Sequence, residues 1–366
     1  MIPYLNLQQL NASFEPQLSE AVLRVTASGQ YLYGEATCRF EAQFARYCGV
    51  RHCVGTANGL DALTLIFLAC RELNLLHDGD EVIVPANTFI ATILAVLRAG
   101  LTPVLCEPRL DTCTIDPEAA ERLITPRTRA ILPVHLYGRQ AAMPVLRELA
   151  ARHHLLVIED AAQAHGGGTP TGLAAAYSFY PAKNLGALGD GGAVVTDDAD
   201  LAAAVRALAN YGASDKYVYI YKGVNSRLDE LQAAVLSVKL ARLDEDNARR
   251  RAIARRYLEQ IPWERTGITA PVLATGIEPD NVFHIFPIFT PRREELQRQL
   301  LAHGIATQIH YPVPPHRQQA LHALFGNLHL PVTERIHREE LSLPISPLLT
   351  DEEVGQVIAA ITADRD

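Results

Sequence analysis

SFYPAKNLGALGDGG, residues 178–192, sets one lysine, Lys183, between an aromatic stretch typical of a strand and a glycine-rich turn. An amine attacks a carbonyl group only when it is unprotonated, and an ordinary lysine has a pKa of about 10.4. Lowering that pKa to about 7 costs roughly 4 to 5 kcal/mol, which burial and a neighbouring cation can supply. A lysine in this setting suits an enzyme that forms a Schiff base; the alternative is a surface lysine in a loop.

The sequence around this segment predicts an α/β fold. Short β-branched runs alternate with amphipathic helices from about residue 81 to 196, which is typical of a mostly parallel sheet with helices on both faces. Ligands collect beyond the carboxyl ends of strands in such sheets, so the strand-terminal residues Asn87, His135 and Asp160 are candidate site residues. The expected strands are 81–85, 103–106, 130–134 and 155–158, and the expected helices between them are 88–99 and 143–152.

Two domains are expected. Helices over 14–27 and 36–48 precede the sheet, and a long arginine-rich helix over 228–260 follows it. We read this long helix as the connection to a remainder that suits a small α/β unit. The expected division is therefore a large cofactor-binding domain over residues 1–240, which includes the N-terminal helices, and a small C-terminal domain over residues 241–366.

Composition limits the class of protein. The chain has 366 residues, of which 48% are hydrophobic and 20% are charged, and this suits a globular protein with a sizeable core. Its formal net charge of −8 gives no general attraction to nucleic acid or to an anionic membrane, so an anionic ligand requires a local site. We expect neither nucleic acid nor a membrane as a partner.

The 6 cysteines are expected to be reduced. They are scattered without a CxxC pair, and several lie in apolar runs where a thiol behaves as a small hydrophobe. This pattern argues against disulfides and against a zinc site, and no other metal site is expected. No charged and then apolar leader opens the chain, and no apolar run of about 18 residues occurs in it. A cytoplasmic location is the expectation.

Five motifs identify the chain's relatives. They are Asn58-Gly59-Leu60-Asp61-Ala62-Leu63, Pro85-Ala86-Asn87-Thr88-Phe89, Glu159-Asp160-Ala161-Ala162-Gln163-Ala164-His165-Gly166, the Lys183 segment and Asn225-Ser226-Arg227-Leu228-Asp229-Glu230. With these motifs in this order, the chain resembles the sugar aminotransferase family named for DegT, DnrJ, EryC1 and StrS from Ile2 to near its C-terminus. The resemblance implies an aspartate-aminotransferase-like fold of type I and pyridoxal phosphate (PLP) as the cofactor.

The resemblance also assigns cofactor contacts. Lys183 would bind the PLP aldehyde covalently and later move a proton between substrate and cofactor. Asp160 ends an apolar strand, where a carboxylate is costly unless a cation such as a protonated pyridine nitrogen pairs with it; the alternative is a helix cap. Gln163 would bond the phenolic oxygen of PLP. Phe89 would stack on the ring, although taken alone it suits a core position.

A phosphate site is expected where Asn58, Gly59 and Leu60 open a helix and Ser178 stands five residues before the lysine. Neither segment contains an arginine. By resemblance, Asn225 of the partner subunit supplies part of the charge-binding contact, which implies a homodimer with shared active sites. Gly59 alone could equally be an ordinary turn glycine.

Two segments are candidates for binding a nucleotide-sugar. Residues 216–222, with Tyr219 and Tyr221, and residues 309–316 combine aromatic with basic side chains; the alternative is an exposed loop and a proline-rich connector. The residues of these motifs are similar to those of the family branch that aminates C3 of dTDP-3-keto-6-deoxyhexoses. In that branch the sugar pocket uses a tyrosine, here Tyr180, and a His-Tyr pair from the partner, here His310 and Tyr311.

The leading hypothesis is a PLP-dependent transaminase that moves an amino group from L-glutamate to C3 of a dTDP-linked keto-6-deoxyhexose. Amination at C4 is an alternative, because either ketone supports the same chemistry. A sugar dehydratase is disfavoured by Lys183, because the family's dehydratases carry histidine there. A non-catalytic regulator is disfavoured by the acidic charge and by the intact Lys183, Asp160 and Asn225.

Two positions depart from the family pattern. The segment 166–172, GGGTPTG, is short where relatives carry a longer hairpin with a charged tip. This removes support for substrate contacts from the loop, but not for the cofactor contacts. Glu107 stands where many relatives have aspartate, and we expect a variation at a surface strand.

Overall fold

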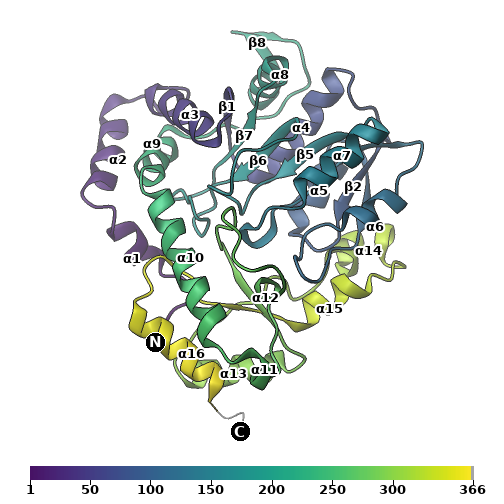
Figure 1. Cartoon of the computed structure of the whole chain (residues 1–366). Helices are drawn as coiled ribbons and strands as arrows, with labels where there is room; N and C mark the ends of the chain where they lie inside the picture. The colour runs from purple at the N-terminus through teal and green to yellow at the C-terminus, as the bar shows by residue number, and fades with distance from the viewer. Residues whose placement is uncertain (364–366) are drawn as a thin grey trace.

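A seven-stranded sheet forms the centre of the larger part of the molecule (Figure 1). The computed structural model describes residues 1–363. The strand order is β1-β7-β6-β5-β4-β2-β3, in which β7 runs antiparallel to both of its neighbours and the other adjacent strands are parallel. The strands are β1 (His52–Thr56), β2 (Glu81–Pro85), β3 (Thr102–Cys106), β4 (Thr128–Ile131), β5 (Leu156–Asp160), β6 (Ala174–Ser178) and β7 (Gly192–Thr196).

Helices cover both faces of this sheet. Val82 and Val84 of β2 pack with α4, α5 and α8 in one apolar cluster, whereas Ile83 between them packs with α6 and α7 in another. Burial on both faces explains why the run Val82-Ile83-Val84 is apolar at consecutive positions. The helices of this part are α1 (Leu7–Ala12), α2 (Gln17–Ser28), α3 (Glu35–Cys48), α4 (Gly59–Glu72), α5 (Ile90–Arg98), α6 (Pro117–Arg122), α7 (Met143–His153), α8 (Ala199–Ala209) and α9 (Glu230–Leu240), with a 3-10 turn at Leu136–Gly138.

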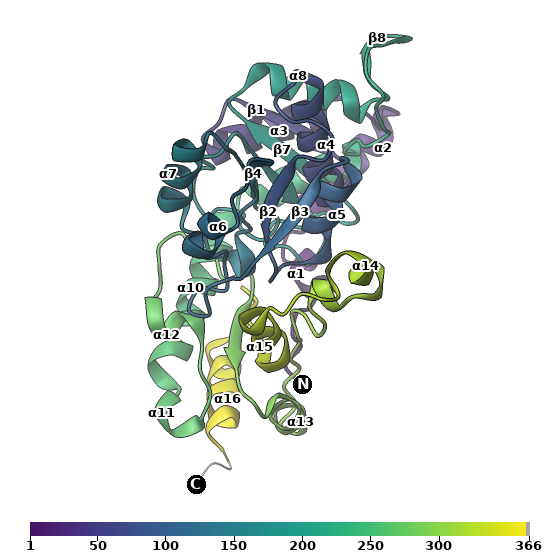
Figure 2. The same ribbon diagram turned by 90° about the vertical axis from the view of Figure 1, so that its right-hand side faces the viewer.

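The smaller part lies below the sheet and has its own apolar cluster, to which α10, α13 and α16 contribute (Figure 2). Its strands β10 (Phe286–Phe289) and β11 (Glu340–Leu343) pair antiparallel. Its helices are α10 (Leu243–Gln260), α11 (Trp263–Thr266), α12 (Pro271–Thr275), α13 (Arg293–Ala302), α14 (His322–Phe325), α15 (Pro331–Glu339) and α16 (Asp351–Thr362), with 3-10 turns at Pro315–Arg317 and Gln319–Leu321. The domain boundary at residue 240 stays a prediction.

The single long helix expected over 228–260 is wrong, because α9 ends at Leu240 and α10 begins at Leu243. Arg242 has a backbone that is distorted from an ideal helix, with φ of −110° and ψ of 0°. Its guanidinium donates to the carbonyl and the hydroxyl of Ser13 and pairs with Asp246, so contacts with the N-terminal helices hold the break. The predicted α/β class with a mostly parallel sheet is confirmed.

A two-stranded hairpin, β8 (Ala213–Asp215) with β9 (Val218–Tyr219), projects from the top of the larger part (Figure 2). All 6 cysteines are unpaired thiols, and only Cys38 is exposed. Among residues 1–363, no helix combines the length and the apolar character that crossing a membrane requires.

Candidate active site

Lys183 lies in the loop between β6 and β7, beyond the carboxyl end of the strands. Backbone hydrogen bonds fold this loop back on itself, from Phe179 N to Gly191 O at 2.7 Å and from Ala187 N to Phe179 O at 2.8 Å. The Lys183 amine forms no hydrogen bond or ion pair with any residue in the described range 1–363. Burial lowers its pKa to about 8, against the opposing effect of the negative charge of Asp160. The lysine is therefore a free amine of depressed basicity.

The rate at which the apoprotein binds the aldehyde of PLP covalently should rise with pH up to about 8 and then level off. An amine with a pKa of about 8 is about one-tenth unprotonated at pH 7, whereas an ordinary lysine at about 10.4 is below about one-thousandth. Rapid mixing across about pH 6 to 10, followed by visible absorbance, measures this rate. A rate that still rises tenfold per pH unit above about pH 9 would contradict a buried reactive amine.

Asp160 ends β5 beside this lysine and is buried. Thr92 Oγ1 donates to its Oδ2 at 2.8 Å, and Ala162 N donates to its Oδ1 at 3.1 Å. Burial raises the pKa of Asp160, while these hydrogen bonds and the charge of Lys183 act in the opposite direction. No described cation lies within ion-pair distance of this carboxylate. Such a group is suited to a cationic ligand atom.

Gln163 connects the end of β5 to two tyrosines. Its Oε1 accepts a hydrogen bond from Tyr137 N at 2.6 Å, and its Nε2 donates to the Tyr311 hydroxyl at 3.1 Å. The Tyr311 ring faces Phe89, with centroids 5.4 Å apart and planes at 44°. The Phe89 residue is 53% exposed, so its ring retains free area on which a flat ligand can stack.

His310 and Tyr311 lie beside Lys183 of their own chain, so the expectation that the partner supplies them is wrong. Tyr311 reaches Gln163 across 148 residues of sequence, and Tyr137 Oη donates to the His310 carbonyl at 2.6 Å. The smaller part folds back toward the sheet of the same chain (Figure 2). No local pattern indicates which subunit receives such a distant segment.

A buried network that the sequence analysis missed fixes His310. Glu340 Oε2 accepts from His310 N at 2.6 Å, and the Ser342 hydroxyl lies 2.8 Å from His310 Nδ1 and donates to Glu340. Burial raises the pKa of Glu340 to about 8. The backbone of Tyr137 is left-handed, with φ of 63°, which turns its N–H toward Gln163. The local sequence signal for this network was the alternation of polar residues with leucines in β11.

The start of α4 and Ser178 form a tight cradle. Asn58 Oδ1 accepts from Asp61 N at 2.8 Å and caps the helix. A Cβ on Gly59 would lie 2.7 Å from Ser178 Cβ, so a residue with a side chain would push the helix start away. Leu60 packs against the apolar cluster beneath. Backbone N–H groups at a helix start together with a hydroxyl suit a phosphate group.

The structure places the other predicted residues in two groups. Tyr180 is 56% exposed on the Lys183 loop. Tyr219 lies on the projecting hairpin, in a pocket with Tyr33 and Tyr211, and Tyr221 packs against the apolar cluster of α4 and α8. Asn225 is exposed and pairs through its backbone with Asn210. Among the described contacts of one chain, none joins Tyr219, Tyr221 or Asn225 to Lys183.

Of the strand-terminal candidates, only Asp160 faces the lysine. Asn87 Nδ2 donates to the carbonyl of Cys113 at 3.1 Å and fixes a loop. His135 Nε2 pairs with Glu159 at 2.7 Å. Glu159 lies on the opposite face of β5 from Asp160, because side chains alternate along a strand. Asn87 and His135 therefore support the sheet edge.

Both departures from the family pattern have structural roles. Thr171 N and Gly172 N donate to Glu159 Oε1 at 2.7 and 2.5 Å, so the short loop 166–172 folds onto β5. Glu107 is not a surface variation. Its carboxylate accepts from Val332 N at 2.8 Å and Thr333 N at 3.0 Å, and so it caps the start of α15 and links the two parts.

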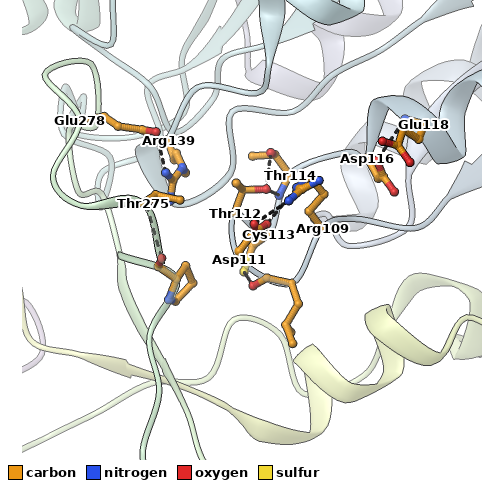
Figure 3. Close-up of polar contacts among 12 residues, drawn as sticks. Arg109, Asp111, Thr112, Cys113, Thr114, Asp116, Glu118, Arg139, Thr275 and Glu278 are labelled. Atoms are coloured by element: carbon orange, nitrogen blue, oxygen red, sulfur yellow. Dashed lines mark hydrogen bonds and ion pairs between the residues drawn. The ribbon is translucent and has the colours of Figure 1, made fainter. Parts of the chain in front are cut away.

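A further small cavity is lined by Tyr137, Thr112 and Arg139, among other residues. Figure 3 shows the polar contacts around Thr112 and Arg139. The arginines at this cavity are already neutralised: Arg139 pairs with Glu278 at 2.7 Å, and nearby Arg109 pairs with Asp111 at 2.7 Å (Figure 3). This cavity therefore offers an anion little net charge, unlike the surroundings of Lys183.

Comparison with known proteins shows the family of this chain. Residues 13–362 match the model of the DegT/DnrJ/EryC1/StrS aminotransferase family. The chain belongs to the DegT/DnrJ/EryC1/StrS aminotransferase family. It is 49% identical to dTDP-3-amino-3,6-dideoxy-alpha-D-galactopyranose transaminase of Aneurinibacillus thermoaerophilus, over 99% of each chain.

Solved structures agree with membership of the DegT/DnrJ/EryC1/StrS aminotransferase family. Streptomyces venezuelae DesV, described in complex with a ketimine intermediate, superposes with a TM-score of 0.92 at 48% identity, over 98% of this chain and 97% of DesV. Bacillus subtilis NtdA with bound cofactor PMP gives a TM-score of 0.90 at 33% identity, over 98% of this chain and 84% of NtdA. The predicted PLP aminotransferase fold, enzyme class and PLP cofactor are confirmed.

The residues present fit PLP. The start of α4 approaches Ser178 so closely that only glycine fits at position 59, which leaves the backbone there uncovered by a side chain. Among residues 1–363, the buried Asp160 carboxylate has no ion pair and the Lys183 amine has no hydrogen bond. These three features match the phosphate, the ring nitrogen and the aldehyde of one flat molecule.

Proposed function

We propose that the protein transfers the amino group of L-glutamate to C3 of a dTDP-linked 3-keto-6-deoxyhexose. The observation that carries the proposal is the buried, free amine of Lys183 beside the buried carboxylate of Asp160. The sugar and its position are supported by the 49% identity to a dTDP-3-amino-sugar transaminase over 99% of the chain. A cytoplasmic location stays a prediction.

Different residues of the chain would have different roles in the reaction. Bound PLP supplies an aldehyde that accepts the amino group and a ring that delocalises the electrons released at the donor carbon. Lys183 Nζ would hold the aldehyde when PLP is bound, and its amine would accept and return the proton that the reaction moves. Asp160 would keep the ring nitrogen of bound PLP protonated, and Thr92 orients Asp160 through its hydrogen bond to Oδ2. Ser178 and the start of α4, from Asn58 to Leu60, would hold the phosphate.

Three residues near Lys183 are placed to hold the sugar. Tyr180 is exposed on the lysine loop, and His310 with Tyr311 is fixed beside it by Glu340 and Gln163. Their hydroxyl and ring nitrogen groups suit hydrogen bonds to sugar hydroxyls. We assign these three residues to the hexose and place Tyr219 and Tyr221 on the nucleotide side of a partner's site.

The function is tested by incubating the PLP-loaded protein with L-glutamate and a panel of dTDP-3-keto- and dTDP-4-keto-6-deoxyhexoses, with the new amine located by NMR. An amine at C3 is the expected product. An amine at C4 would overturn the position, a deoxygenated sugar would indicate a dehydratase, and no turnover with any sugar would contradict the substrate class.

The active unit is proposed to be a homodimer with shared sites. Tyr217 and Tyr219 of the hairpin are 79% and 59% exposed, and Tyr33 and Tyr211 line the open pocket beside them. Such an aromatic surface suits a protein interface. Asn225 at the base of this hairpin faces solvent rather than its own Ser178, which supports its assignment to the phosphate site of the partner.

A mixture of two inactive variants should regain activity if the sites are shared. Lys183→Ala and Asn225→Ala, unfolded and refolded together in equal amounts, should form about one-half mixed dimers, each with one intact site, and about one-quarter of wild-type activity. The measurement is amino-sugar formation, with each variant refolded alone as the control. No recovery, or an Asn225→Ala protein that is fully active alone, would contradict shared sites.

A further inference from the structure

A second cationic cavity adjoins Lys183. It has a volume of about 90 Å³ and lies where the N-terminal segment and the Lys183 loop meet the smaller part, including α10. Ala182, the residue before Lys183, forms one wall, and Tyr4, Arg250, His284 and His310 supply polar groups. We call it the Arg250 cavity. None of the residues that line it is acidic.

Arg250 is buried here with its charge unpaired. The residue is 4% exposed, and its Nη1 donates to the carbonyls of Phe283 and Ile345. Its Nε has no hydrogen-bond partner, and no carboxylate among residues 1–363 lies within ion-pair distance of it. Arg139, by contrast, is equally buried but is paired with Glu278. A buried guanidinium without a carboxylate is costly unless a ligand supplies one.

The acidic groups nearest to the cavity are already engaged. Asp246, one turn before Arg250 on α10, pairs with Arg242 at 3.2 Å. Glu340 accepts from His310 N and from Ser342 behind the cavity wall. The charges of Lys183 and Arg250 act together on His284, adding to the burial that lowers its pKa. The cavity is therefore a positive pocket with no internal counter-ion.

We propose that the Arg250 cavity binds a carboxylate group of the amino-acid donor, L-glutamate. The proposal rests on the proposed function, in which the donor amine must reach the position of Lys183 Nζ. The cavity wall at Ala182 is one residue from that lysine, so a donor whose amine is at the lysine can place a carboxylate in the cavity. A planar guanidinium matches a carboxylate through paired N–H···O bonds.

Arg250→Gln in the PLP-loaded enzyme tests this assignment by separating the two half-reactions. When the variant is mixed rapidly with L-glutamate alone, the second-order rate constant of the half-reaction should be about 30- to 100-fold lower than in the wild type. This is the effect expected for loss of a charge-assisted pair. The variant loaded with the amino form of the cofactor and mixed with the keto-sugar should react at a rate within about threefold of the wild-type rate. Calorimetric binding of glutarate, a dicarboxylate without an amine, should weaken by a similar factor.

Arg249→Gln is the matched control, because Arg249 also ties α10 to other segments of the smaller part, through Leu349 and Asp351, but does not line the cavity. It should leave both half-reactions and glutarate binding unchanged. Gln308→Glu adds an acid to the cavity wall while leaving Arg250 in place, and should also weaken glutarate binding. Equal loss in both half-reactions, or unchanged glutarate binding in Arg250→Gln and Gln308→Glu, would overturn the proposal. If the wild type binds glutarate but aminates no sugar, the proposed function fails and this inference stands.

Discussion

Lys183→Ala should lower amino-sugar formation by about 10⁴-fold or more, because one residue both holds the cofactor aldehyde and carries the proton. The substitution removes the free amine whose pKa burial lowers to about 8. Reduction of the PLP-loaded wild type with borohydride should fix one pyridoxyl group on the peptide that contains Lys183. Peptide mass spectrometry measures this, and the variant should carry no label.

Lys239 provides an internal control for this experiment. Burial lowers its pKa to about 8 as well, but its Nζ donates to Asn11 Oδ1 at 2.7 Å and Gly186 O at 2.8 Å. A lysine whose protons are engaged in this way should stay unlabelled in the wild type. A label on Lys239, or a Lys183→Ala protein within tenfold of wild-type turnover, would show that depressed basicity alone does not select the reactive lysine.

The contrast between these two lysines shows what sequence can and cannot predict. Lys183, Asp160 and Gln163 each lie in a short motif at a strand end, so local pattern and resemblance were sufficient to select them. Lys239 lies in α9, and its depressed pKa arises from burial and from the charge of Arg242. Burial of this kind depends on tertiary packing and leaves no periodic pattern in the sequence.

The roles that the sequence analysis missed also depend on tertiary contacts. Thr92 contacts Asp160 across 68 residues, and Glu107 caps α15 across more than 200 residues. The break between α9 and α10 contains Ala241 and Arg242, neither of which is a helix breaker. The hydrogen bonds from Arg242 to Ser13, more than 200 residues away in the sequence, hold this break. Strand and motif positions follow from local periodicity, whereas partners across the fold do not.

Asp160→Asn should lower the rate of the glutamate half-reaction by about 10³-fold, because the amide keeps the shape but not the charge that holds the ring nitrogen protonated. Among residues 1–363, no cation lies within ion-pair distance of this buried carboxylate, so its charge is available to a bound ligand. Rapid mixing of the PLP-loaded variant with L-glutamate measures the loss.

Two comparisons separate the charge of Asp160 from its packing. Thr92→Val removes the 2.8 Å hydrogen bond to Oδ2 but leaves the carboxylate, so it should cost about tenfold or less. PLP methylated on its ring nitrogen carries a permanent positive charge, and loading Asp160→Asn with it should restore most of the lost rate, because the ring no longer depends on a carboxylate to stay cationic. If the methylated cofactor fails to rescue Asp160→Asn, the loss of rate comes from altered packing at the end of β5. If Thr92→Val loses as much rate as Asp160→Asn, the orientation of the carboxylate matters rather than its charge alone.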